Sequence, residues 1–356
     1  MRKRSGKFFT QRMNGVCSAL LLMVVVAACR KDKPEAPVAA PVQLGQQGGA
    51  YITNEGNFLW GNSGVSYYDN ASGSVFEDLF QSANGTALGD VCQSMTLFNG
   101  TAYLVVNNSD KVVLVDPNTF AQQGEITGFV SPRYLLPVSN AKAYVTDLAG
   151  DAIAVVDLVS RAITGTIPCP GATEELVLAV GKAFVTNTDR EQLYVIDTAT
   201  DAIVDSITVG RGANSLVQDA NGKLWVLCSG YMGLGNNAVL HRVDPASLQV
   251  EASFTFPSSS DSPWRLRING GHDQLYFLNN DVYRMPITAV ALPTAPFIAA
   301  VGRNFYGLGV DPGSDVVYAA DAVDYVQRGV VYRYAQDGAV LNSFHVGIIP
   351  GGFSFR

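Results

Sequence analysis

The sequence has little charge and few of the residues that usually build metal or hydrolytic sites. Only 15% of its 356 residues are charged, and its three histidines, His241, His272 and His345, lie far apart without metal-ligand spacing. The sequence contains no G-x-S-x-G elbow, P-loop or EF-hand loop. The hydrophobic fraction of 47% excludes a disordered chain, and the low Lys and Glu content argues against a coiled coil. We therefore expect a folded chain without a metal site or a cofactor.

Cysteine is also scarce in the main part of the chain. Beyond the N-terminal segment only Cys92, Cys169 and Cys228 remain. An odd number at irregular spacing is not a disulfide framework, and at most one pair among the three can form. We expect them to be small buried residues.

The first 28 residues differ from everything that follows. Residues 1–14 carry five basic and no acidic residues, and an apolar run extends from Val16 to Ala28. This is the layout of a secretory signal, because the apolar run is too short to span a bilayer comfortably. The rest of the chain has 19 basic and 31 acidic residues, a net charge near −12. Such an acidic body repels nucleic acid and anionic lipid, so we expect no nucleic-acid partner.

The end of this leader resembles a known processing site. Val26-Ala27-Ala28-Cys29 is similar to the lipobox of bacterial lipoproteins, in which the cysteine is acylated and becomes the mature N-terminus. The resemblance implies a signal peptide over 1–28 and a lipid on Cys29, through which alone the protein contacts a membrane. Residues 29–49 contain three prolines and few large apolar residues, and we expect a flexible tether there.

The remainder of the chain repeats a short strand-like segment that begins with an aromatic residue and mostly ends with Asn or Asp. The successive aromatics are 52, 41, 40, 41, 51 and 42 residues apart. They are Tyr51, Tyr103, Tyr144, Phe184, Trp225, Tyr276 and Tyr318. The interval matches the period of a propeller blade, and each copy contains further strand-like segments. We therefore predict an all-β, seven-bladed β-propeller over 50–356 with four antiparallel strands per blade, whose many turns use the 35 glycines.

The two ends of the repeat region complement each other. The first repeat starts at Tyr51 without a preceding innermost strand, and the chain finishes with a strand-like segment, Gly351 to Arg356. Pairing of this last strand into the first blade would close the ring and leave no open edge.

The repeats carry a family resemblance. Tyr144-Val-Thr-Asp147 and Phe184-Val-Thr-Asn187 resemble the YVTN-type repeat of YncE-like and surface-layer-like propellers. Asn54-Glu-Gly-Asn57 and Ser131-Pro-Arg-Tyr134 are similar to a lipoprotein branch of that family found beside TonB-dependent transporters. That branch includes surface lipoproteins that capture cobalamin. The resemblance implies an outer-membrane, cell-surface lipoprotein that binds a corrinoid and delivers it to such a transporter.

Insertions predict where a ligand would bind. Repeats 1 and 5 are longer than the others, and the extra residues fall naturally at Gly56–Gly64, Gln81–Asp90, Ser229–Asn237 and Ser258–Pro263. All four segments belong to loops of one face in blade geometry, and insertions on one face of a repeat array usually mark its binding face.

The residues that these loops and strand starts present are aromatic and polar. Candidate apolar walls are Phe58, Trp60, Tyr134, Tyr231, Trp264, Tyr306 and Tyr325. Candidate hydrogen-bonding residues are Asn57, Asn107, Asn108, Arg133, Asn187, Asn214 and Arg265. This mixture suits a large neutral ligand with amide groups and a flat ring, such as a corrinoid, or a glycan. Alternatively, the Asn side chains cap strand ends, and Tyr134 and Tyr306 pack between blades.

The sequence is compatible with three functions. A non-enzymatic, ligand-capturing lipoprotein is the first hypothesis, and a surface scaffold for proteins or glycans is the second. A propeller lactonase or lyase is the third. Glu174 and Glu175 form a carboxylate pair, but adjacent strand residues point to opposite faces, so we do not expect them to share a proton.

Overall fold

The structure is a computed structural model that describes residues 44, 48–230 and 235–356. All of them belong to one compact unit, residues 41–356. The predicted signal peptide, the predicted lipidation site Cys29 and nearly all of the predicted tether lie outside the described residues, as does Tyr231. Among the described residues no helix has the length and apolar character that a membrane crossing needs.

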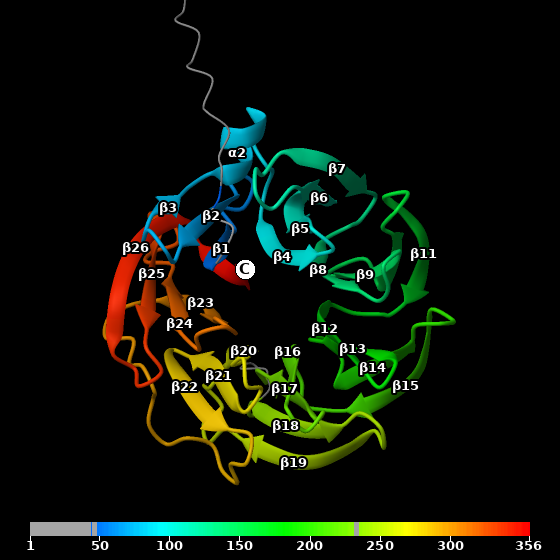
Figure 1. Cartoon of the computed structure of the whole chain (residues 1–356). Helices are drawn as coiled ribbons and strands as arrows, with labels where there is room; N and C mark the ends of the chain where they lie inside the picture. The colour runs from blue at the N-terminus through cyan, green and yellow to red at the C-terminus, as the bar shows by residue number, and fades with distance from the viewer. Residues whose placement is uncertain (1–43, 45–47, 231–234) are drawn as a thin grey trace, which may run out of the picture. The chain divides into compact units, whose positions relative to one another are not determined.

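Seven β-sheets are arranged in a ring, as predicted from the repeat (Figure 1). The first sheet has the order β27-β1-β2-β3, with β27 innermost. Its strands are Pro350–Phe355, Gly49–Asn54, Gly64–Asp69 and Val75–Phe76. In the other six sheets the strands follow the chain from the centre outward, so each of these blades begins at the axis of the ring.

The next three blades each contain four antiparallel strands. The second is β4 to β7: Cys92–Phe98, Thr101–Val106, Lys111–Val115 and Gln122–Thr127. The third is β8 to β11: Pro132–Pro137, Lys142–Asp147, Ala152–Asp157 and Ala162–Pro168. The fourth is β12 to β15: Thr173–Ala179, Lys182–Asn187, Gln192–Asp197 and Ala202–Thr208.

The last three blades are less uniform. The fifth is β16 to β19: Ala213–Gln218, Leu224–Cys228, Val239–Asp244 and Gln249–Thr255. The sixth has only β20 to β22: Trp264–Ile268, Gln274–Asn279 and Asp281–Pro286. The seventh is β23 to β26: Phe305–Val310, Val317–Asp321, Arg328–Tyr334 and Val340–Ile348.

The predicted closure of the ring is confirmed. Strand β27 pairs antiparallel with β1, and Phe353 lies opposite Ile52. The C-terminal strand therefore supplies the innermost strand of the blade that the N-terminal repeat begins (Figure 1).

Two local features depart from the sequence prediction. The sixth blade has three described strands instead of four, because the segment after β22 contains Pro293 and Pro296, which cannot donate ladder hydrogen bonds. A single bridge between Val282 and Ile298 stands in for the fourth strand. Part of the predicted loop Gln81–Asp90 is instead helix α2, Leu79–Asn84, which packs against β2 and β7.

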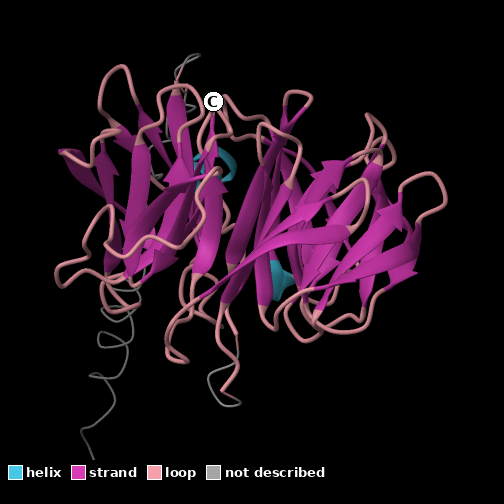
Figure 2. Ribbon diagram, turned by 90° about the horizontal axis from the view of Figure 1, so that it is seen from below, coloured by secondary structure: helices cyan, strands magenta, loops and turns pink. Residues whose placement is uncertain are grey.

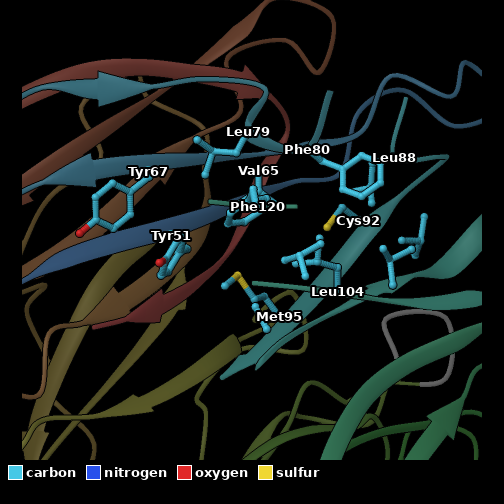
Figure 3. Packing of buried hydrophobic residues seen from close by; sticks show 14 of the residues in the cluster. Tyr51, Val65, Tyr67, Leu79, Phe80, Leu88, Cys92, Met95, Leu104 and Phe120 are labelled. Carbon is cyan, nitrogen blue, oxygen red and sulfur yellow. The ribbon is translucent and has the colours of Figure 1, made fainter. Parts of the chain in front are cut away.

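The hydrophobic core lies between neighbouring sheets. The repeated aromatics are almost completely buried, and Tyr51 joins Val65, Tyr67 and Phe120 in the cluster between the first two blades (Figure 3). Cys92, Cys169 and Cys228 are buried free thiols, as predicted. Burial raises the pKa of Cys169 and of Cys228 to about 12, so both stay protonated and inert at neutral pH.

The strands run between two faces that carry the connecting loops (Figure 2). We call the face on which the innermost strands begin the start face. The loops that follow β1, β5, β9 and the equivalent strands also lie there, because each of these strands is antiparallel to its innermost neighbour.

Candidate functional site

Each innermost strand carries one β-bulge close to the start face. In β4, for example, Cys92 and Ser94 lie opposite Val106 and Val105, so Gln93 is one residue in excess. The same extra residue occurs in all seven blades, at or beside Gln93, Arg133, Glu174, Asn214, Arg265, Tyr306 and Gly351. Bulges redirect side chains, and here they turn polar residues of the innermost strands toward the axis of the ring.

These residues line a cavity of about 410 Å³ over the axis. Eight of the predicted site residues lie together there: Phe58, Asn107, Arg133, Tyr134, Asn214, Trp264, Arg265 and Tyr306. The other walls include Glu55, Gln93, Glu174 and Glu175. We call this space the axial cavity. Its residues come from at least six blades, so the closed ring is needed to assemble it.

The charges of the axial cavity are paired. Arg133 donates from Nε to both oxygens of Glu174, at 3.1 and 3.0 Å. Arg265 Nη2 lies 3.3 Å from Glu55 Oε1, and Arg267 Nη1 lies 2.9 Å from Glu175 Oε1. Each of the three carboxylates that line the cavity is therefore paired with a guanidinium group, although that of Arg267 lies outside the lining.

Arg265 is the most constrained of these side chains. It is only 6% exposed, and its backbone has a left-handed φ of 57°. Its guanidinium carbon lies 5.1 Å from the Trp264 ring centroid and 5.6 Å from that of Tyr306. Its Nη1 donates to the Tyr134 hydroxyl at 3.1 Å, whereas its buried Nε has no hydrogen-bond partner among the described residues. A non-glycine residue held in this conformation is often part of a functional site.

Burial sets the protonation of the cavity's phenols. It raises the pKa of Tyr134 and of Tyr306 above the usual value, so both stay neutral at neutral pH. The Tyr306 hydroxyl donates to Glu55 Oε2 at 2.8 Å. Burial also raises the pKa of Glu174, although Arg133 and Arg265 act in the opposite direction. The cavity thus offers hydrogen-bond donors and acceptors in fixed positions.

A loop beside the cavity exposes three consecutive apolar residues. Phe58, Leu59 and Trp60 are 63%, 75% and 77% exposed. The Leu59 N–H donates to Asp90 Oδ2 at 2.7 Å, and Asn108 Nδ2 donates to the same oxygen at 2.5 Å. A run of exposed apolar side chains is unfavourable in water unless it serves to bind a ligand or a partner.

The loop is also tied down on its other side. Asn57 Nδ2 donates to the carbonyl of Tyr325 at 2.6 Å, and the Asn57 N–H donates to Asn62 Oδ1 at 2.8 Å. Of the predicted polar residues, Asn57 and Asn108 therefore hold the loop in place, and they do not line the axial cavity.

Several asparagines cap chain segments, which is the alternative considered for them above. Asn187 Oδ1 accepts from the N–H groups of Asp189 and Arg190, and this side chain lies outside the axial cavity. Asn107 and Asn214 line the cavity but also donate to backbone carbonyls, those of Pro132 and Pro263. Tyr325 borders a separate cavity on the same face.

The expectation for Glu174 and Glu175 needs correction. The bulge in β12 removes the alternation of adjacent residues, so both side chains line the axial cavity. They still have different partners, since Glu174 binds Arg133 whereas Glu175 binds Arg267 and accepts from the Leu216 N–H.

Sequence reasoning did not select Glu55 or Gln93 as site residues. Both occupy positions that the repeats mark: Glu55 directly follows the first aromatic strand, and Gln93 is the second residue of its innermost strand. Comparing that second position across all repeats would have found Gln93 together with Arg133, Glu174 and Asn214.

A larger cavity of about 520 Å³ lies away from the axis. Phe254, Tyr283, Leu292 and Pro293 form much of its wall, so it fills the space beside the incomplete sixth blade. Its described lining includes no bulge residue of an innermost strand and no basic residue, and we therefore place the candidate site at the axis.

Comparisons with known proteins agree with this architecture. A family model described as a domain of unknown function, DUF5074, matches residues 48–337. The "Seven-bladed beta-propeller protein Rv1057" of Mycobacterium tuberculosis is 27% identical over 130 residues. That match spans 34% of this chain and only 33% of the relative's length.

Two solved structures share the fold at low identity. A quinonprotein alcohol dehydrogenase-like protein of Bacteroides thetaiotaomicron has a TM-score of 0.67 at 17% identity, covering 86% of this chain and 78% of its own. A putative 6-phosphogluconolactonase of Bacteroides fragilis also has a TM-score of 0.67, at 11% identity, covering 87% of this chain and 98% of its own. At these identities the likeness extends to the fold alone.

Proposed function

The chain belongs to the DUF5074 family, and we propose that this β-propeller is a non-enzymatic protein that captures a large neutral ligand at the axial cavity. Our first choice of ligand is a corrinoid such as cobalamin. The observation that carries the proposal is the axial cavity, which six of the seven bulge residues line, in which every carboxylate is paired with an arginine and aromatic rings form part of the wall.

The pairing of charges favours a neutral ligand. An anion bound at Arg265 would compete with Glu55 and leave a buried carboxylate without its partner, and a cation at Glu174 would do the same to Arg133. Breaking a buried pair is strongly unfavourable. Amide and hydroxyl groups can instead bond to the existing network, while a flat ring packs against Phe58 and Trp264.

The polar side chains of the axial cavity are already engaged in hydrogen bonds and ion pairs, which favours ligand binding over catalysis. The Ser215 hydroxyl donates to Asn214 Oδ1 at 2.7 Å and accepts from the Leu266 N–H at 3.0 Å, so it is not poised beside a base. Each carboxylate of the cavity already faces an arginine. A nucleophile or general base needs a free, correctly placed partner.

The proposal also includes a location. The lipobox-like sequence ending at Cys29 supports a lipid anchor at the outer membrane, with the propeller at the cell surface. There the captured ligand would pass to a TonB-dependent transporter. The exposed Phe58-Leu59-Trp60 tip supports a second candidate, a scaffold whose start face binds a protein or a glycan directly.

Calorimetric titration of the purified protein with cyanocobalamin tests the corrinoid proposal. We expect saturable binding, and Arg265→Gln should weaken it because the paired floor is lost. Absence of heat, together with no coloured ligand in the purified protein, would remove the corrinoid. Binding of an oligosaccharide in the same assay would support the scaffold.

A further inference from the structure

A second, smaller cavity lies beside the axial one, between the sixth and seventh blades. Its volume is about 230 Å³, and Trp264 lines both cavities. The rings of Trp264 and Tyr306 meet edge to face at 4.7 Å, and those of Tyr306 and Tyr325 do so at 5.8 Å. This row of three rings separates the two spaces. We call the smaller one the side cavity.

Three polar side chains of the side cavity are available to a ligand, whereas those of Asn279 and Ser260 already bond to Asp261 and Ser258. The Asn280 amide and the Ser262 hydroxyl make no hydrogen bond to any described residue, although both line the cavity. Among the described residues the Asn304 side chain makes only long bonds, from Nδ2 to the Val323 carbonyl at 3.5 Å and from the Tyr325 hydroxyl to Oδ1 at 3.4 Å. These amides and hydroxyls can both donate and accept.

One cation completes the wall. The Arg303 guanidinium carbon lies 4.2 Å from the Tyr332 ring centroid, and its Nη1 donates to the Tyr334 hydroxyl at 3.2 Å. None of the described residues that line this cavity is acidic. This wall therefore suits a neutral polar group, or one carrying a phosphate, better than a cation.

We propose that the side cavity binds a single sugar ring. A sugar has an apolar C–H face, which fits the rings of Trp264 and Tyr325, and a rim of hydroxyls, which fits Asn280, Asn304 and Ser262. The small volume holds one ring and excludes a larger ring system, which needs the axial cavity. The ring belongs either to a glycan end or to a ribose phosphate attached to a larger ligand.

The substitution Asn280→Gly tests this assignment with little effect on the backbone. Asn280 is exposed and has a left-handed φ of 59°, which glycine adopts readily. Asn99→Gly is the matched control, since Asn99 is also exposed, has a φ of 46° and lies in the β4–β5 turn on the opposite face. Thermal melting of both variants checks that each remains folded.

The probes are the methyl glycosides of glucose, galactose, mannose and N-acetylglucosamine, and ribose 5-phosphate, measured by saturation-transfer NMR titration. We expect at least one probe to bind the unmodified protein. It should bind Asn280→Gly about tenfold more weakly, because one hydrogen bond is lost, and it should bind Asn99→Gly as tightly as the unmodified protein. Binding of a glycoside identifies a glycan end, and binding of ribose 5-phosphate alone identifies the arm of a larger ligand.

Two results would overturn the proposal. One is no signal from any probe with the unmodified protein, and the other is equal binding by the unmodified protein and Asn280→Gly. Because none of these probes is a corrinoid, the outcome is independent of the cyanocobalamin titration. Each of the two binding proposals can therefore be refuted while the other stands.

Discussion

Gly351 lies directly against Glu55, and a Cβ atom at position 351 would lie 2.5 Å from Glu55 Oε1. The same Cβ would lie 3.1 Å from Arg265 Nη2. The bulge of the closing strand thus carries no side chain, which leaves room for the ion pair between Glu55 and Arg265, two residues 210 positions apart. Ring closure and the floor of the axial cavity are therefore coupled at this glycine.

Gly351→Ala should separate Glu55 from Arg265. Because the added methyl group meets buried, paired side chains, we expect a loss of about 1–3 kcal/mol in the free energy of unfolding. Ligand binding should weaken as well. Gly165→Ala is the control, since its Cβ would meet only Val155 Cβ, at 3.9 Å. Chemical denaturation measures both variants, and equal stability of the two would contradict the coupling.

Removal of residues 351–356 should destabilise the entire propeller. The truncation deletes most of β27, exposes the inner edge of β1 and uncovers Tyr318, which packs on Phe353 and Phe355. We expect one cooperative unfolding transition at a clearly lower temperature, measured by circular dichroism or calorimetry. A melting curve like that of the full chain would show that closure does not hold the ring together.

A half-buried histidine should make stability sensitive to mild acid. Burial lowers the pKa of His241 below 6.5, and its Nε2 accepts from the Gly210 N–H at 3.2 Å. The unfolded chain then binds a proton more readily than the folded one. The stability contributed by neutral His241 is complete above pH 6.5 and is lost as the pH falls from there through the lower folded pKa.

His241→Gln should reduce this loss, because glutamine can accept the same hydrogen bond without titrating. Denaturation at pH 5 to 7 measures the slope, and His272→Gln is the control, since His272 is exposed and its Nδ1 bonds to the Gln218 carbonyl. A His241→Gln slope as steep as that of the unmodified protein would show that other groups cause it.

The fold was predictable because the repeat makes the same contacts seven times. Each aromatic strand is buried between sheets, so its residues recur with the period of a blade and stand out against the variable turns. The ring closure was predictable in the same way, because the first repeat lacks an innermost strand and the C-terminus carries one strand-like segment more than the repeats need. Helix α2 has only six residues, too few for a helical period to be distinguished.

The site was predictable only in part. Trp264, Arg265 and Tyr306 were predicted because they are aromatic or polar and lie at the starts of innermost strands, and they do meet in the axial cavity. The bulges could not be recognised in the sequence. One extra residue changes the direction in which a side chain points, but it hardly changes the number of residues between successive repeats. Glu55 was missed since its partner Arg265 lies five blades further along the chain, and their contact depends on closure.

Trp60→Ala should separate binding from stability. The indole is 77% exposed at a loop whose backbone is held by Asp90, so its removal should change the free energy of unfolding by less than about 0.5 kcal/mol. If Trp60 packs on the ligand's ring, cyanocobalamin should bind about tenfold more weakly, as loss of one aromatic contact implies. Val159→Ala is the control, because Val159 is 76% exposed in the β10–β11 turn on the opposite face. A melting temperature lowered by several degrees would instead assign the indole to the packing of the loop, and equal weakening by the control would place the effect outside the start face.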